Sequence, residues 1–481
     1  MTSKTALSRD GDFPRTEEVT LPQKPPPHGT AALRSATSHT KAALDRIARF
    51  DDRLKAMITV TADTALARAA EADLAASRGD SLGLLHGMTV SLKDVIHTAG
   101  VRTTGGSKIH ADFVPRDDAE VVRRLKSAGA IIVGKNNLHE LAYGGTTQNP
   151  FFGSCRNPWD PERIPGGSSG GSGAAVAADY SDVSLGTDTA GSGRIPASLN
   201  GVAGLRPTCG RISNRNVIPC SLPFDTISPL ARRVADIARV FAVIAGHDPA
   251  DPLSADQPLE NFLPALGAGV KGVRLGLPRT YFFDQAEPEV QEAVMQAARL
   301  LERLGARLVD VSLPGAEVAK DYFEKIFHSD AAAYHRETLR SSPDLFGADT
   351  RDRLNSLGGS FTAVDYALGL RWMENWKHNL KGRFREVDAI LTPMTPIPAP
   401  RVADSLQTTT TTRRLTLFSY VWAIAQIPVL VLPCGFTSEG LPFGLSLAAA
   451  WWQEPLLFRI GTAYQAETDW HLRRAPMIAD S

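Results

Sequence analysis

The sequence has few cysteines and no excess of charge of either sign. Only four cysteines occur in 481 residues and none forms a C-x-x-C pair, which excludes a disulfide framework and favours a reducing cytoplasm. The 52 lysine and arginine residues equal the 52 aspartate and glutamate residues, so no net field attracts nucleic acid or an anionic membrane. We therefore expect a cytoplasmic protein with no nucleic-acid partner and no membrane partner.

The sequence also has little that would direct it to a bilayer or hold it there. The first ten residues have no apolar segment of the kind found in signal peptides. The most apolar late stretch, residues 418–433, includes Gln426 and Pro428 and is shorter than a membrane-spanning helix. This stretch predicts the buried core of a globular protein.

Composition and periodicity indicate a globular α/β fold. Hydrophobic residues make up 43% of the chain and charged residues 22%, which is ordinary for such a protein. Residues 1–28 are polar and proline-rich and predict a flexible N-terminal arm. Across residues 29–481, short apolar runs alternate with helical stretches, which predicts a sheet covered by helices on both faces. The polar run of threonines at residues 408–412 predicts a loop.

The first informative segment is Pro-Gly-Gly-Ser-Ser-Gly-Gly-Ser-Gly at residues 165–173, followed directly by an Ala/Val stretch. A flexible linker would not usually run into a helix in this way. A glycine-rich turn that opens onto a helix exposes backbone N–H groups, which suit a negative or developing negative charge. No lysine follows, which excludes a P-loop, and Val176 stands where a dinucleotide-binding fingerprint needs glycine or alanine.

The same segment contains the pattern G-x-S-x-G, which is the nucleophile elbow of α/β-hydrolases. On that pattern, Ser168 or Ser169 would be the nucleophile of an esterase. A later histidine, such as His247 or His471, would be its base. This alternative stays open.

The second segment is Leu-Gly-Thr-Asp-Thr-Ala-Gly-Ser-Gly-Arg-Ile-Pro at residues 185–196, which begins at the end of a predicted strand. Its small residues let the backbone approach a substrate closely, as an oxyanion hole requires. We expect Asp188 and Arg194 to hold the loop by pairing. The backbone N–H groups that can converge on one point are those of Thr189, Ala190, Gly191 and Ser192.

The third feature is Lys93, which directly follows the apolar run of residues 90–92. A lysine at the end of a buried strand can have a desolvated ammonium group. Desolvation disfavours the charged form, lowers the pKa and makes the amine a base near neutral pH.

Together, the three segments resemble the amidase signature family over roughly residues 30–475. The resemblance implies one large domain over residues 29–481, built on a central mixed, twisted β-sheet with helices on both faces. The stretches that carry it are Gly87 to Asp94, Arg156 to Trp159, Pro165 to Ser172, Gly186 to Pro196 and Gly204 to Ser213.

The resemblance implies a Ser-cisSer-Lys triad that needs no metal and no organic cofactor. The family's lysine corresponds to Lys93, its bridging serine on a cis peptide to Ser168, and its nucleophile to Ser192. The family's oxyanion stretch corresponds to residues 189–192. Its pocket wall falls on Tyr143 and Gly144, although the residues alone leave substrate contact and core packing equally open for Tyr143.

The implied activity is hydrolysis of the C–N bond of a small amide, carbamate or urea-like substrate through a Ser192 acyl-enzyme, with release of ammonia or an amine. We expect a stand-alone amidase, as a single chain or a homodimer. The alternative is the A subunit of the tRNA-dependent glutamine amidotransferase. That subunit typically has Met-Asp-Glu-Phe-Ala-Met-Gly where this chain has Leu-His-Glu-Leu-Ala-Tyr-Gly at residues 138–144. The stretch Thr-Ala-Gly-Ser-Gly-Arg at residues 189–194 is similar to the allophanate hydrolase branch.

Overall fold

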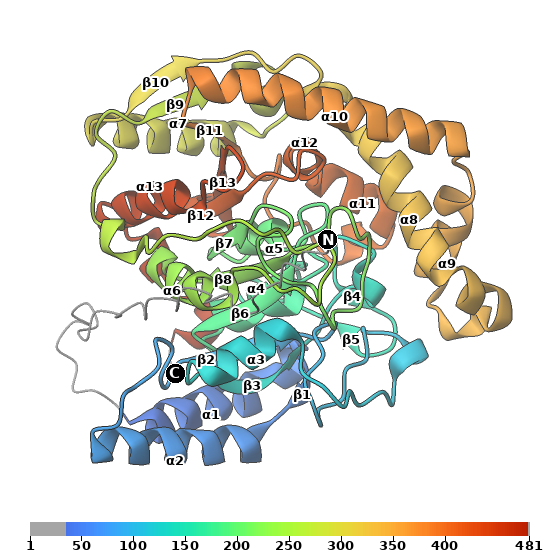
Figure 1. The fold of residues 1–481 in the computed structure, drawn as a ribbon. Helices are drawn as coiled ribbons and strands as arrows, with labels where there is room; N and C mark the ends of the chain where they lie inside the picture. Colours follow the sequence, from blue (N-terminus) through green and yellow to red (C-terminus); the bar gives the residue numbers. More distant parts are fainter. Residues whose placement is uncertain (1–34, 480–481) are drawn as a thin grey trace, which may run out of the picture.

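The computed structural model describes residues 35–479, which form a single α/β domain around an 11-stranded sheet (Figure 1). The predicted arm at residues 1–28 lies outside the described residues. In spatial order the strands are β1 (Met57–Val60), β3 (Ile131–Asn136), β2 (Thr89–Lys93), β6 (Val183–Thr187), β8 (Ile227–Ala231), β7 (Ala203–Arg206), β12 (Val429–Phe436), β13 (Pro442–Ala449), β11 (Ala389–Pro393), β9 (Arg274–Leu277) and β10 (Arg307–Asp310).

The sheet is mixed, as the sequence predicts. Strand β2 runs parallel to both of its neighbours, β3 and β6. From β6 onward the pairs β6–β8, β8–β7, β7–β12 and β12–β13 are antiparallel. A separate two-stranded ladder joins β4 (Gln148–Asn149) to β5 (Gly153–Ser154). The predicted fold class is confirmed.

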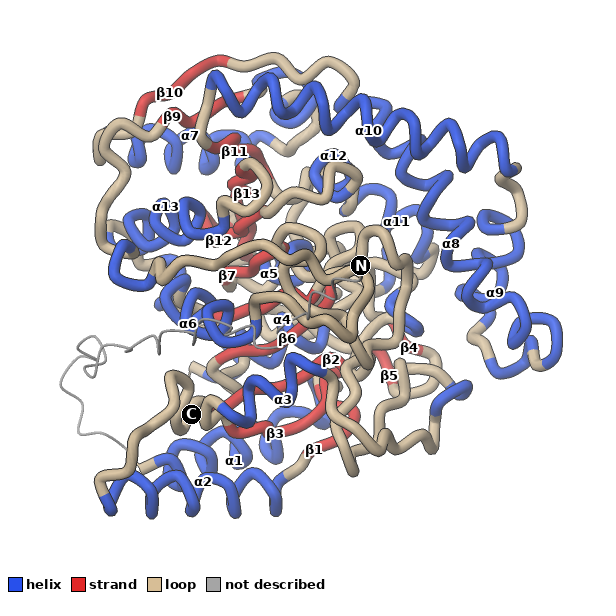
Figure 2. The backbone as a smooth tube through the Cα atoms, viewed as in Figure 1, coloured by secondary structure: helices blue, strands red, loops and turns tan. Residues whose placement is uncertain are grey.

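Helices cover the sheet, and the coloured tube in Figure 2 shows them on its outside. Every residue of β2, β6, β7 and β8 is buried, which requires cover on both faces of these strands. The helices are α1 (Ala36–Leu54), α2 (Ala62–Arg78), α3 (Glu120–Ser127), α4 (Gly170–Ala177), α5 (Arg194–Leu199), α6 (Val234–Ile244), α7 (Pro288–Arg303), α8 (Ala319–Ser341), α9 (Ala348–Arg353), α10 (Ala363–Glu386), α11 (Thr408–Leu415), α12 (Ser419–Ala423) and α13 (Glu454–Ala466).

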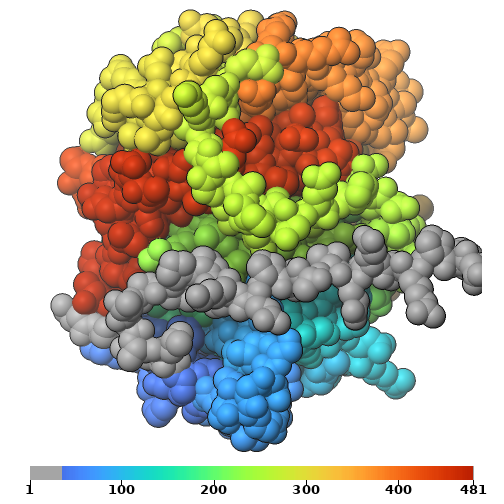
Figure 3. All heavy atoms as spheres, turned by 60° about the vertical axis from the view of Figure 1, so that its left-hand side comes forward, coloured from blue at the N-terminus to red at the C-terminus, as the bar shows by residue number. Residues whose placement is uncertain are grey.

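The order of the strands determines which parts of the chain lie side by side. The C-terminal strands β12 and β13 insert between β7 and β11. Figure 3 shows the same order on one face, where the red C-terminal band lies between the green and the yellow-orange regions. Residues far apart in sequence therefore meet along the sheet.

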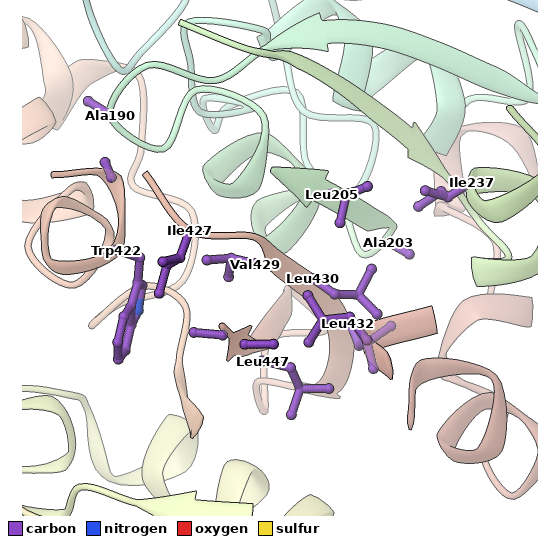
Figure 4. Packing of buried hydrophobic residues seen from close by; sticks show 14 of the residues in the cluster. Ala190, Ala203, Leu205, Ile237, Trp422, Ile427, Val429, Leu430, Leu432 and Leu447 are labelled. Carbon is purple, nitrogen blue, oxygen red and sulfur yellow. The ribbon is translucent and has the colours of Figure 1, made fainter. Parts of the chain in front are cut away.

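Buried hydrophobic side chains pack together where β7, β12 and β13 pair (Figure 4). Leu430 pairs with Leu205 on one side and with Leu447 on the other, and all three side chains are fully buried. Burial of each such side chain contributes roughly 1.5–3 kcal/mol. The apolar stretch at residues 418–433 is thus core, as predicted. Among the described helices, none combines the length and the apolar content that a bilayer crossing needs.

Helix α4 lies inside the molecule because its residues are small. All eight of its residues are buried, and it contacts β2 and β6. A Cβ added to Gly171 would lie 2.4 Å from the carbonyl oxygen of Asn137, so only glycine fits there. The glycine-rich segment is therefore the start of a core helix, not a linker.

The prediction of a loop at residues 408–412 is wrong, because this run begins α11. Thr412 Oγ1 accepts a hydrogen bond of 2.9 Å from the N–H of Gly145, and Thr408 Oγ1 donates one of 2.5 Å to Asp349. These tertiary contacts outweigh the weak helix propensity of threonine.

Candidate active site

Lys93 lies where two parallel strands end at the same edge of the sheet. It is the last residue of β2, and Thr187 is the last residue of the neighbouring β6. The Lys93 side chain is fully buried, and its Nζ donates hydrogen bonds of 2.7 Å to Thr187 Oγ1 and 2.7 Å to Ser168 Oγ. The structure thus brings together two of the three predicted catalytic side chains.

The burial of Lys93 changes its proton affinity. Desolvation is the largest effect and lowers the pKa of the amine from its ordinary 10.5 to about 7, although Cys220, Asp225 and Asp188 oppose this shift. Near neutral pH, a substantial fraction of Lys93 is therefore an uncharged base.

Ser168 lies two residues before the start of α4, at a point where other backbone comes very close. The Gly167–Ser168 peptide bond is cis, and the Ser168 carbonyl accepts a hydrogen bond of 3.0 Å from the N–H of His139. A Cβ on Gly167 would lie 2.7 Å from the Gly145 carbonyl carbon, so a larger residue is excluded.

Ser169 has a different environment. Its hydroxyl donates to the Thr187 carbonyl at 3.0 Å and accepts from the Thr187 N–H at 3.2 Å. These bonds tie α4 to β6, as expected for a structural hydroxyl.

Ser192 lies on the loop that follows β6. Its carbonyl accepts a hydrogen bond of 3.1 Å from the N–H of Ser169, which holds the loop against the segment that contains Ser168. The neighbouring Gly191 has a φ of 126°, and a Cβ there would lie 2.6 Å from Ser419 Oγ. Only glycine satisfies both conditions. The Ser192 residue keeps 8% exposure.

The Asp188 carboxylate holds this loop in place through hydrogen bonds to its backbone. It accepts hydrogen bonds from the N–H groups of Gly191, Gly193 and Arg194 at 2.9, 3.2 and 3.2 Å. It also forms ion pairs with the fully buried guanidinium groups of Arg194 at 2.9 Å and Arg206 at 3.1 Å. Burial opposes ionisation, but the two guanidinium groups outweigh it and hold the pKa of Asp188 well below its usual range. The predicted Asp188–Arg194 pair is confirmed, whereas the sequence reading missed Arg206.

The loop leaves a specific set of backbone donors available. The N–H of Gly191 is engaged by Asp188. Within the described part of the chain, the N–H groups of Thr189, Ala190 and Ser192 make no hydrogen bond. Of the four N–H groups at residues 189–192 that the sequence suggests, three are therefore available to bind an oxyanion, and that of Gly191 is not.

Tyr143 packs into the protein, with 1% exposure. Its ring stacks on Phe327, the Arg353 guanidinium lies 4.6 Å from its centroid, and its hydroxyl shares a short hydrogen bond with His328. A Cβ on Gly144 would overlap the His139 ring at 2.2 Å. Packing accounts for both residues here, and a role in substrate contact stays a prediction.

The histidines considered for an esterase triad lie elsewhere. Residue 247 is exposed, and burial lowers the pKa of His471 to about 4. Within the described structure, neither one hydrogen-bonds to Ser168 or Ser169, and the Ser168 hydroxyl is bound by Lys93 instead.

Comparison with known proteins identifies the family of this chain. The Amidase family model matches residues 38–458. The chain belongs to the amidase family. It is an enzyme that acts on carbon–nitrogen bonds, as the sequence resemblance implies.

Individual relatives of this amidase fall into more than one group. It is 37% identical to the A subunit of the glutamyl-tRNA(Gln) amidotransferase of Geobacter sp. (strain M21), over 92% of this chain and 96% of that protein. A structure of a vestigial protein complex that reveals the evolutionary origins of an s-triazine catabolic enzyme is 36% identical, with a TM-score of 0.85 over 90% of this chain and 95% of that one. The peptide amidase of Stenotrophomonas maltophilia is 32% identical, with a TM-score of 0.78 over 93% and 96%.

The amidase should show a rise of kcat/KM with pH that has its midpoint near pH 7. The predicted base is Lys93, which must be uncharged to accept a proton, and burial lowers its pKa to about 7. Activity should thus be lost as pH falls below the midpoint and reach a plateau above it. Initial rates between about pH 5 and pH 9 test this, and a rise that continues toward the ordinary lysine value would contradict it.

Proposed function

We propose that this amidase cleaves a C–N bond through an acyl-enzyme on Ser192, with Ser168 as proton relay and Lys93 as base. The observation that carries the proposal is the fully buried Lys93 Nζ, 2.7 Å from Ser168 Oγ and beside the Ser192 loop. A lysine with its pKa lowered to about 7 is suited to general base catalysis.

The proposed reaction has two stages, formation of the acyl-enzyme and its hydrolysis. Uncharged Lys93 accepts the Ser168 hydroxyl proton as Ser168 accepts the Ser192 proton, and the Ser192 oxygen attacks the carbonyl carbon. The backbone N–H groups of residues 189, 190 and 192 hold the resulting oxyanion, each worth roughly 10²–10³-fold in kcat in other enzymes. The relay then protonates the leaving nitrogen, the C–N bond breaks, and ammonia or an amine departs. Water attacks the acyl-enzyme along the same proton path and regenerates Ser192.

The comparisons favour a component of an amidotransferase complex over a stand-alone amidase as the setting for this chemistry. Relatives named as the A subunit of glutamyl-tRNA(Gln) amidotransferase are 37% and 39% identical over 92% of the chain. The favoured candidate is therefore hydrolysis of the glutamine amide within a complex that passes ammonia to another chain and involves a tRNA substrate. The stand-alone candidate keeps a small amide, carbamate or urea as its partner and needs no nucleic acid. Four unpaired cysteines fit a cytoplasmic location for either candidate.

A substrate panel with and without partner chains separates the candidates. The full chain is assayed for release of ammonia or amine from glutamine, simple amides, carbamates and ureas, with Ser192→Ala as the blank. Turnover of a small amide by the chain alone supports the stand-alone enzyme. Glutaminase activity that appears only with co-purified chains supports the amidotransferase component. Turnover that is equal in the Ser192→Ala protein would overturn the proposal as a whole.

A further inference from the structure

Asp225 is a half-buried carboxylate that the proposed reaction does not use, although it is bonded to the oxyanion loop. Its Oδ1 accepts a hydrogen bond of 2.5 Å from Thr189 Oγ1. Its Oδ2 accepts bonds of 2.7 and 3.0 Å from the N–H groups of Cys220 and Ser221. One carboxylate thus connects the loop that follows β6 to the segment at residues 220–221.

The sheet places Asp225 next to the Lys93 end of β6. Strand β8 pairs with β6 so that Ile227 lies opposite Thr187, whose hydroxyl binds Lys93 Nζ. The carbonyl of Thr226 accepts a hydrogen bond of 2.8 Å from the N–H of Asp188. The chain just before β8 therefore follows the start of the oxyanion loop, and the charges of Asp225 and Lys93 act on each other.

We propose that Asp225 is a positioning residue of the Ser192 site, which orients Thr189 in the oxyanion loop and whose negative charge acts on Lys93. This inference rests on the proposed function. In the described structure Asp225 makes no hydrogen bond to Lys93, Ser168 or Ser192. It acts through Thr189 and through the effect of its charge on the Lys93 amine.

The other ionisable groups around Lys93 leave Asp225 as the effective counter-charge. Burial raises the pKa of the Cys220 thiol well above its usual value, so this thiol is uncharged near neutral pH. Asp188 also faces Lys93, but its charge is compensated by two buried arginines. Asp94, which follows Lys93 in the chain, is paired with Lys135 at 3.2 Å, and both side chains are fully buried.

The ionisation of Asp225 matches this role. Burial is the largest effect and raises its pKa to about 6, while its hydrogen bonds and the charge of Lys93 oppose the rise. The carboxylate is thus charged above about pH 6, where it favours the protonated form of Lys93 and keeps the pKa of that base from falling further. A base whose pKa lies near the working pH is the most effective one.

Two near-isosteric substitutions separate the two effects. Asp225→Asn removes the charge and should move the midpoint of the kcat/KM–pH profile about half a unit to one unit lower, with a reduced kcat. Thr189→Val keeps the charge and the backbone N–H but removes the hydroxyl, so the midpoint should stay while kcat falls about tenfold. Rates are expressed per active site, and thermal unfolding is measured for both proteins.

A purely structural role would lower the melting temperature of both variants and leave the midpoint and kcat per active site unchanged, which would overturn the inference. If Asp225→Asn does not fold, Thr189→Val alone decides, and wild-type kcat in it would overturn the inference. The Ser192→Ala protein distinguishes failure of this inference from failure of the proposed function. If it is inactive while Asp225→Asn has the wild-type midpoint, this inference alone fails; if it is fully active, the proposed function fails.

Discussion

Replacement of Ser192 by alanine should reduce kcat on the order of 10⁶-fold, as loss of the nucleophile does in another serine hydrolase. Lys93→Ala should have a comparable effect, because the Ser168 hydroxyl then loses its base at 2.7 Å. Both proteins should remain folded at neutral pH, since alanine adds no atoms to the site and the pKa of Lys93, lowered to about 7, leaves much of this amine uncharged there. Product release is measured under single-turnover conditions on the best substrate of the panel.

Ser169→Ala is the matched control for these variants. It removes the hydroxyl of the adjacent serine, and that hydroxyl bonds only to the backbone of Thr187. We expect it to lose about tenfold or less in kcat, the effect of one neutral hydrogen bond. Activity that survives in Ser192→Ala but disappears in Ser169→Ala would contradict the assignment.

Asp188→Ala should destabilise the protein by about 3–5 kcal/mol, because it leaves two buried guanidinium groups without their counter-ion. Arg194 and Arg206 are both fully buried, and the loop's N–H groups lose their acceptor as well. The free energy of unfolding is measured by denaturant titration. The dependence of this free energy on denaturant concentration is compared with that of the wild type, because a changed slope would indicate a change other than stability alone.

The matched control for this variant is Asp45→Ala. Asp45 pairs with Lys41 at 2.9 Å on the surface, where the two side chains are 63% and 67% exposed. An exposed pair of this kind contributes about 0.5 kcal/mol or less. Equal losses in Asp188→Ala and Asp45→Ala would show that the buried cluster does not hold the loop.

Much of the site could be predicted because its key residues lie in local patterns. Lys93 follows an apolar strand, and Ser168 and Ser192 lie in glycine-rich turns at the ends of predicted elements. Parallel strands β2 and β6 end at one edge, which brings these turns together. The G-x-S-x-G pattern alone would have selected Ser168, and only the combination of the three segments favours Ser192.

The residues that sequence reasoning missed reach the site through tertiary structure. Arg206 ends β7, two strands away from β6, and joins Asp188 only because of the order β6-β8-β7. Ser419 donates a short hydrogen bond to the carbonyl of Ala190 from α12, more than two hundred residues away in sequence. Thr187 was within a recognised motif, but its bond to Lys93 depends on the strand register. Local patterns contain none of this information.

The central claim is that Ser192 is the nucleophile, and covalent labelling tests it most directly. The full chain is treated with a fluorophosphonate, digested and mapped by mass spectrometry, with Lys93→Ala as the control in which labelling should be strongly slowed. The account predicts one adduct, on Ser192. An adduct on Ser168 or Ser169, with Ser192 unmodified, would contradict it.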